Sequence, residues 1–189
     1  YIKIIYEKSK KLTELINIFH EYSKLEHPDF NLIFEKVDLS EYLRAYIALK
    51  YEDIVESGFN IEVDIPEEEM EIKIDKVQLQ RVFDNILGNS IKHNEKGTNI
   101  YVSLKEKNDI YEIIIADDGK GIPKDIANNI FEAFTVGDES RNSKQGSGLG
   151  LAIAKTIVDL HGGTIELEPE SLKKFSTQFK IILKKNPKL

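Results

Sequence analysis

Residues 85–93 combine amide and basic side chains at spacings that suit a helix facing phosphate. Each helical residue turns the chain by roughly 100°, so Asn85, Asn89, Lys92 and His93 would share one face. Amide oxygens are hard ligands that suit Mg²⁺ beside phosphate oxygens, and Lys92 could meet a phosphate as a point charge. The same side chains would also suit a solvated helix face, so this segment alone leaves both interpretations open.

A glycine-containing turn follows the apolar strand predicted at about residues 111–116. Asp117 stands at the end of that strand, where its carboxylate could accept a hydrogen bond from an exocyclic amine. Gly119 and Gly121 would let the backbone approach a flat ring closely and adopt positive φ angles. Aspartate and glycine are also common in ordinary strand-ending turns, which is the alternative interpretation.

A second glycine-rich segment, residues 146–151, opens a helix predicted at about residues 149–160. Free N–H groups and the positive end of the helix dipole make such a position suitable for phosphate. The spacing of the glycines matches neither the dinucleotide-binding fingerprint nor the P-loop. A hinge that binds no ligand is the alternative.

Hydrophobic patterns predict the elements that must hold these three segments in place. Asp38 and Asp75 are expected to cap two of the helices, and Pro28 to follow the first one. The order of elements predicts an α+β fold with one sheet and helices on one of its faces. The predicted helices are residues 1–27, 38–57, 76–93, 124–130 and 149–160, and the predicted strands are residues 61–65, 71–74, 98–104, 111–116, 164–167 and 178–183.

Composition narrows the class of protein. The chain has 189 residues and a formal net charge of −7, which argues against nucleic acid as a partner. Cysteine is absent, so disulfides and thiolate metal sites are excluded. Neither a membrane-spanning run nor a signal peptide is apparent. We interpret the start at Tyr1 as that of a soluble, cytoplasmic fragment whose parent protein could still be membrane-anchored.

In their order and spacing, these segments resemble the sensor histidine kinase family and the wider ATPase superfamily that includes gyrase-type topoisomerases. The matching segments are residues 85–93 (N box), 117–121 (first glycine box), 130–134 (F box), 146–151 (second glycine box) and 176–179 (late element). The resemblance implies a Bergerat-type ATP-binding fold, a two-layer α/β sandwich with a mixed, mostly antiparallel sheet. It divides the chain into the end of a dimerisation helix hairpin (residues 1–27), a linker (28–37), the ATP-binding domain (38–185) and a tail (186–189).

The resemblance also implies roles for single residues. Asn89, with Asn85 beside it, would bind Mg²⁺, and Lys92 and His93 would contact the phosphates of ATP. Asp117 would hold the adenine amine. The remaining residues implied to bind ATP are Gly119, Gly121, Ile122, Phe134, Gly146, Gly148, Leu149 and Thr177. Residues 135–147 would form a lid, in which Arg141 or Lys144 could neutralise the γ-phosphate.

Some positions depart from the family pattern. Thr135 and Val136 stand where an aromatic–Arg pair is common, which leaves Arg141 as the best lid cation. His20 lacks the Arg-Thr-Pro-type stretch that follows an acceptor histidine, so we expect the acceptor upstream of this chain. His161, before two glycines, is expected to be a helix C-terminal residue, which the helix dipole favours.

The implied function is transfer of the γ-phosphate of Mg·ATP to a histidine in two-component signalling. A response regulator receiver domain would be the downstream partner, and the parent would be a homodimer through its helical hairpin. The alternative is a nucleotide-gated ATPase or a module that binds ATP without histidine phosphotransfer. Hydrolysing relatives typically carry an acidic base where this chain has Asn85, and Asp84 falls off the polar face, which disfavours self-contained hydrolysis.

Overall fold

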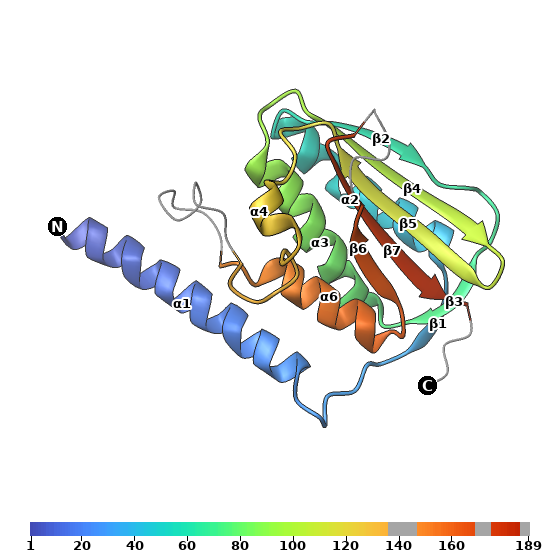
Figure 1. The fold of residues 1–189 in the computed structure, drawn as a ribbon, viewed down its shortest axis with the longest axis horizontal. Coiled ribbons are helices and arrows are strands. Elements are labelled where there is room, and N and C mark those ends of the chain that lie inside the picture. The colour runs from blue at the N-terminus through green and yellow to red at the C-terminus, as the bar shows by residue number, and fades with distance from the viewer. Residues whose placement is uncertain (136–146, 169–174, 186–189) are drawn as a thin grey trace.

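A five-stranded sheet forms one layer of the molecule, in the order β2–β4–β5–β7–β6 (Figure 1). The computed structural model describes residues 1–135, 147–168 and 175–185. Strands β2 and β4 run parallel, whereas the other neighbouring strands pair antiparallel. The mixed, mostly antiparallel sheet expected from the sequence is confirmed. The strands are β2 (Asn60–Asp64), β4 (Asn99–Lys107), β5 (Ile110–Asp117), β6 (Thr164–Leu167) and β7 (Thr177–Lys184).

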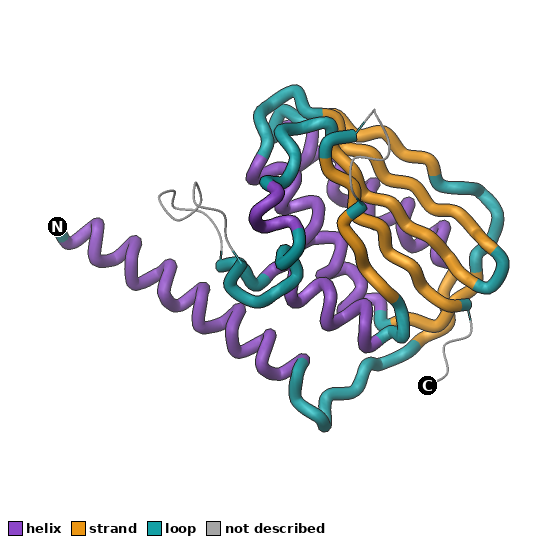
Figure 2. Tube along the Cα trace, in the orientation of Figure 1, coloured by secondary structure: helices purple, strands orange, loops and turns teal. Residues whose placement is uncertain are grey.

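Helices α2 (Leu39–Glu56), α3 (Lys76–His93) and α6 (Gly150–Leu160) cover one face of this sheet (Figure 2). Side chains alternate between the two faces of a strand, and in β5 Ile113 and Ile115 point into the core beneath the helices. Apolar residues of all three helices meet them there in one cluster. The α+β fold class is therefore confirmed.

Local signals set the starts of the two longer core helices. Asp38 caps α2 by accepting a hydrogen bond from Ser40 N at 3.0 Å, and Asp75 caps α3 by accepting one from Gln78 N at 3.0 Å. Both caps satisfy backbone donors that the helix leaves free. The short helix α4 (Lys124–Ala127) ends earlier than the predicted helix at residues 124–130.

A separate two-stranded sheet was not expected. Strand β1 (Glu35–Asp38) pairs antiparallel with β3 (Glu71–Ile74). The last part of the stretch predicted as a linker, residues 28–37, is therefore β-structure, and β3 does not belong to the main sheet. The pairing joins segments far apart in the sequence. Four residues are too few for an alternation of apolar and polar side chains that would predict it.

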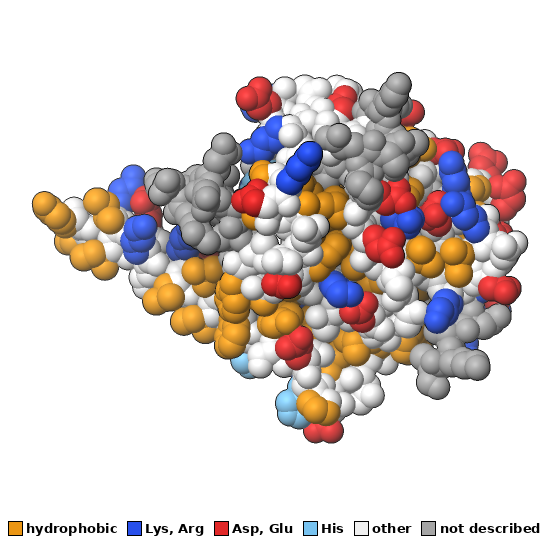
Figure 3. All heavy atoms as spheres, in the orientation of Figure 1, with side chains coloured by type: hydrophobic (Ala, Val, Ile, Leu, Met, Phe, Trp, Pro, Cys, Tyr) orange, Lys and Arg blue, Asp and Glu red, His pale blue; other side chains and the backbone are white. Residues whose placement is uncertain are grey.

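Helix α1 (Ile2–Leu25) extends away from the sheet at one side of the molecule (Figure 1). It touches the rest of the fold near its end, where Leu25 is buried and Glu21 pairs with Arg81 at 2.8 Å. Apolar side chains gather along its exposed surface (Figure 3). None of the helices in the described part of the chain is both long and apolar enough to cross a membrane.

Candidate nucleotide site

The carboxylate of Asp117 lies buried at the end of β5, with 2% of the residue exposed. Ser90 Oγ donates a hydrogen bond to its Oδ2 at 2.8 Å, and Gly119 N donates one to its Oδ1 at 3.2 Å. A buried carboxylate needs such donors because an unpaired charge is costly away from water. Each oxygen keeps a further lone pair, so the group can still accept a hydrogen bond from a ligand.

The last strand supports Asp117 from its other side. Ser176 N donates to the carbonyl oxygen of Asp117 at 2.8 Å, and the register places Thr177 opposite Asp117. Thr177 is itself buried. Gly121 has a φ of +76°, and a Cβ added there would lie 3.4 Å from the carbonyl oxygen of Ser176. The backbone of the glycine turn therefore lies close against the start of β7.

The same turn packs on the end of α3. Lys120 N donates to Asn94 Oδ1 at 3.0 Å, and a Cβ added to Gly119 would lie 2.0 Å from that oxygen. A side chain larger than that of glycine would require the Asn94 side chain to move. Half-buried Ile122, three residues further on, packs against the core. The first glycine segment and the polar helix thus form one connected wall.

The predicted polar face of α3 lies beside the start of α6. Oδ1 of Asn85 is so near Gly150 that an added Cβ would lie 2.8 Å from it. Asn89, one turn further along α3, is partly exposed. No group of three or more His, Cys, Asp or Glu residues suited to a metal occurs among the described residues. Neutral amide oxygens fit Mg²⁺ when phosphates supply the negative ligands, so Asn85 and Asn89 suit this ion.

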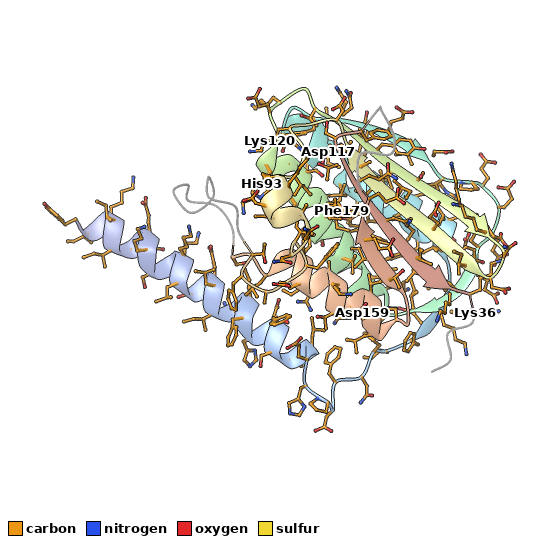
Figure 4. The ribbon with its side chains drawn as sticks, viewed as in Figure 1. Lys36, His93, Asp117, Lys120, Asp159 and Phe179 are labelled. Carbon is orange, nitrogen blue, oxygen red and sulfur yellow. The ribbon has the colours of Figure 1, made fainter. Side chains whose placement is uncertain are left out.

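Positive charge collects at the end of α3. Desolvation and then the nearby charge of Lys11 lower the pKa of Lys92 from its ordinary value. Desolvation, followed by the charges of Lys92 and Lys120, lowers the pKa of His93. Figure 4 shows His93, Lys120 and Asp117 at the same end of the molecule. A bound anion would stabilise the protonated forms of these side chains.

The F box meets the second glycine box through the backbone. Phe134 N donates to the carbonyl oxygen of Gly148 at 2.9 Å. Gly148 has a φ of +68°, and a Cβ added there would lie 2.7 Å from the carbonyl carbon of Phe134. Leu149 is buried at the start of α6. The ring centroid of Phe134 lies 6.3 Å from that of Phe19 on α1. Arg141, Lys144, Val136 and Gly146 lie outside the described residues.

Residues 74–187 match the family model described as histidine kinase-, DNA gyrase B- and HSP90-like ATPase. The chain belongs to this ATPase family. The sensor histidine kinase YvrG of Bacillus subtilis (strain 168) is 30% identical over 183 residues, which are 97% of this chain and 31% of that protein. The resemblance to the catalytic domain of sensor histidine kinases is thereby confirmed, and the chain spans about a third of the length of this relative.

Solved structures agree on the fold. Full-length ShkA in complex with AMPPNP superposes with a TM-score of 0.74 and 23% identity, covering 97% of this chain and 38% of that one. The histidine kinase ThkA in complex with the response regulator protein TrrA gives a TM-score of 0.74 and 24% identity, covering 99% of this chain and 51% of that one. At these identities the likeness establishes the shared fold.

Sequence reasoning missed two residues that this member of the ATPase family uses to hold Asp117 and its turn. Ser90 lies four residues after Ile86 and seven after Phe83, on the buried face of α3. A hydroxyl on an apolar face needs a partner, which is the signal that could have found it. Asn94 directly follows α3, where a polar side chain that folds back onto a neighbouring turn is common.

Asp84 has partners on the side of α2. Tyr46 Oη donates to its Oδ1 at 3.0 Å, and Lys50 Nζ lies 2.9 Å from the same oxygen. Burial, followed by the charge of Asp84 and its hydrogen bond, raises the pKa of Tyr46 well above its ordinary value. The tyrosine therefore remains a donor, and the carboxylate is held as an ion-paired acceptor on the α2 side.

Proposed function

We propose that this domain binds Mg·ATP and donates the γ-phosphate to a histidine outside the chain, as the catalytic part of a two-component sensor kinase. The observation that carries the proposal is the buried, doubly hydrogen-bonded carboxylate of Asp117 beside two closely packed glycine turns. Family membership and a sensor histidine kinase relative over nearly the whole chain support it.

In the proposed complex, Asp117 accepts the adenine amine, and Gly119, Gly121 and Ile122 form the slot for the ring, with Thr177 supporting it. The Mg²⁺ ion would be held by Asn89 and Asn85, and it would neutralise charge on the phosphate oxygens.

The phosphate-binding residues of the proposal come from three segments. Lys92 and His93 at the end of α3 would meet the phosphates, and Gly148 and Leu149 would lie against them at the start of α6. Desolvation, and then the charges of neighbouring lysines, lower the pKa of Lys92 and of His93, and this gathering of basic side chains supports an anion at this end. Phe134 would flank the nucleotide, while Gly146 and Arg141 take part on resemblance alone.

The proposed partners follow from the helix α1 and from the relatives. Ile4, Ile5 and Leu12 of α1 are each 58% or more exposed, which suits packing against the helical hairpin of a homodimeric parent. ThkA forms a complex with the response regulator protein TrrA. We infer that a receiver domain takes the phosphoryl group from the histidine of the parent.

The alternative function is a nucleotide-gated ATPase or ATP-binding module. Its hydrolysing form needs a carboxylate that activates water next to the phosphates. The position suited to that base holds Asn85, and Asp84 is engaged by Tyr46 and Lys50. Both observations favour transfer to an external acceptor over hydrolysis by this chain.

A phosphotransfer assay tests the proposal. The chain is mixed with Mg²⁺, γ-³²P-labelled ATP and a separately supplied helical hairpin that carries an acceptor histidine. We expect label on the hairpin and little free phosphate without it. ATP binding without transfer, together with steady phosphate release by the chain alone, would favour the alternative.

The variant Asp117→Asn tests the adenine position. An amide replaces an acceptor-only carboxylate with a mixed donor and acceptor, so the preference for ATP over GTP should fall. Titration calorimetry with both nucleotides measures this preference, with Asp118→Asn as the control for the same change at the exposed neighbour. Equal preference in wild type and Asp117→Asn would show that adenine is held elsewhere.

A further inference from the structure

A buried histidine joins the ends of α3 and α6 that lie far from the nucleotide site. His161 Nε2 accepts a hydrogen bond from Asp75 N at 3.0 Å, while its Nδ1 lies 2.7 Å from the carbonyl oxygen of Ile157. Nδ1 must carry the proton, because a carbonyl can only accept and Nε2 is already an acceptor. His161 ends α6, as expected, and desolvation lowers its pKa, whereas the hydrogen bond to the Ile157 carbonyl and the charge of Asp75 act in the opposite direction.

The side chain of Asp75 extends this junction to the linker after α1. Its Oδ1 caps α3 through Gln78 N, and its Oδ2 accepts a hydrogen bond from Ile33 N at 2.9 Å. The ring of Phe34 stands edge-on to His161, with centroids 5.5 Å apart. One aspartate and one histidine therefore connect the linker, α3 and α6.

The junction and the nucleotide site are opposite ends of the same helix pair. Helices α3 and α6 lie side by side (Figure 1). Asp75 contacts His161 where α3 begins and α6 ends, and Asn85 in the middle of α3 contacts Gly150 at the start of α6. Ten residues of α3 separate the two contacts, which is about 15 Å along the helix. A change in packing at either end can therefore tilt one helix against the other.

Apolar contacts hold α1 and the linker on the domain, because Leu25 is buried and Ile18, Tyr22 and Phe30 pack against the core. The ion pair between Glu21 and Arg81 has its carboxylate side chain 58% exposed, and such pairs contribute little. An open hollow of about 440 Å³ separates the end of α1 from the start of α3. Lys24, His27 and Phe30 line its outer side, and Asp75 and Gln78 line its inner side. The hydrogen bond from Ile33 to Asp75 crosses to the domain at this point.

We infer that Asp75 and His161 are positioning residues that couple the linker after α1 to the packing of the two helices that wall the nucleotide site. Nucleotide binding would tighten the hold on the linker, and release of the linker would weaken nucleotide binding by the same factor. The coupling to nucleotide binding rests on the proposed function, whereas the role of Asp75 and His161 in holding the linker does not.

Three variants separate the bonds of the junction. Asp75→Asn keeps an Oδ1 that caps α3 but replaces the oxygen that accepts from Ile33 with an amide nitrogen. His161→Asn keeps a donor for the Ile157 carbonyl but removes the acceptor for Asp75 N. His161→Gln retains an acceptor that reaches Asp75 N. Asp29→Asn, in the exposed linker, controls for the change in charge.

Hydrogen exchange of single amides, measured by NMR on the whole chain with and without AMP-PNP, gives the readout. In wild type, AMP-PNP should slow exchange of the Ile33 amide. Asp75→Asn and His161→Asn should speed that exchange about fivefold without nucleotide, the effect of about one hydrogen bond. In both variants AMP-PNP should no longer slow exchange of the Ile33 amide. The affinity for AMP-PNP should fall by the same factor by which AMP-PNP slows that exchange in wild type. His161→Gln and Asp29→Asn should behave as wild type.

The inference is overturned if the Ile33 amide exchanges at the wild-type rate in both Asp75→Asn and His161→Asn. It is also overturned if either variant binds AMP-PNP more weakly while AMP-PNP still slows exchange of the Ile33 amide as in wild type. If one variant does not fold, the other one decides, and Asp75→Asn keeps both the cap of α3 and the backbone bond to His161. Failure of the proposed function looks different. If the chain does not bind nucleotide, AMP-PNP will not bind wild type, and if it binds without phosphotransfer, only the phosphotransfer assay fails; the exchange rates without nucleotide support or overturn the junction in either case.

Discussion

Helices α1 and α3 have similar apolar patterns, yet only α3 has its apolar face fully covered by the rest of the described structure. Helix α3 buries Leu79, Phe83 and Ile86 completely, each with 0% exposure. Helix α1 leaves Leu12, Ile16 and Phe19 more than half exposed. The difference teaches that a hydrophobic period in the sequence predicts an apolar helix face. It does not identify the surface that buries this face, which lies elsewhere in the sequence or in another molecule.

The largest expected effect comes from the buried face of α3. Phe83 is fully buried and its ring lies 5.3 Å from that of Tyr46 and 6.2 Å from that of Tyr42. Phe83→Ala should lower the free energy of unfolding by about 3–5 kcal/mol, because it removes apolar contacts and leaves a cavity. Phe19→Ala on α1 should change it by less than about 1 kcal/mol. Urea unfolding measures both, and equal losses would contradict the comparison.

The buried hydroxyl of α3 should have the next largest effect. Ser90→Ala removes one of the two described donors to the Asp117 carboxylate, which should cost about 2 kcal/mol of unfolding free energy. Ser23→Ala, at an exposed position of α1, is the matched control and should be nearly neutral. Urea unfolding again gives the values. A neutral Ser90→Ala would mean that Asp117 does not depend on this donor.

The polar face of α3 should matter for binding and not for folding. Asn89→Ala should weaken Mg²⁺-dependent ATP binding by about tenfold, because a ligand to a charged group is lost. Its urea midpoint should stay that of wild type, since Asn89 is partly exposed. Titration calorimetry with and without Mg²⁺ measures the affinity. Unchanged affinity would remove Asn89 from the metal site.

The end of α3 should take up protons when nucleotide binds. The pKa of free His93 is lowered from its ordinary 6.5, and adjacent phosphate should raise it in the complex. The complex then binds more protons than the free protein, so affinity should rise as the pH falls through about 6.5. Calorimetry in two buffers of different ionisation enthalpy measures this uptake. His93→Gln should reduce it, and an unchanged uptake would place the phosphates away from His93.

The ion pair between α1 and α3 should have the smallest effect on the free energy of unfolding. Glu21→Gln removes the ion pair of α1 with Arg81 of α3. Because the pair is exposed, the loss should be below about 1 kcal/mol and should vanish at high salt. Urea unfolding at two salt concentrations checks it. A loss that persists at high salt would show that α1 is held more firmly than the comparison assumes.

The sequence predicted elements whose signals are local. Residues 76–93 form α3 with Asp75 as its cap, as expected, because the cap and the helical period lie within one stretch. Strand β1 was missed because its pairing with β3 is non-local. The bond between His161 and Asp75 was not foreseen for the same reason, since the two residues lie 86 positions apart.

The candidate site divides in the same way. Its residue types and their order were readable, and the structure brings Asp117, Gly119 and Thr177 together. The support from Ser90 was not foreseen because it joins α3 to β5 across 27 residues. The roles assigned to single residues in ligand binding stay predictions until the variants above are measured.

The edges of the main sheet bear on how the protein associates with itself. Edge strands β2 and β6 have five and four residues, and both carry exposed glutamates. Short, charged edges resist the strand-to-strand addition that leads to aggregates. Association through the sheet is thereby discouraged, which agrees with our proposal that the homodimeric parent associates through the exposed apolar surface of α1.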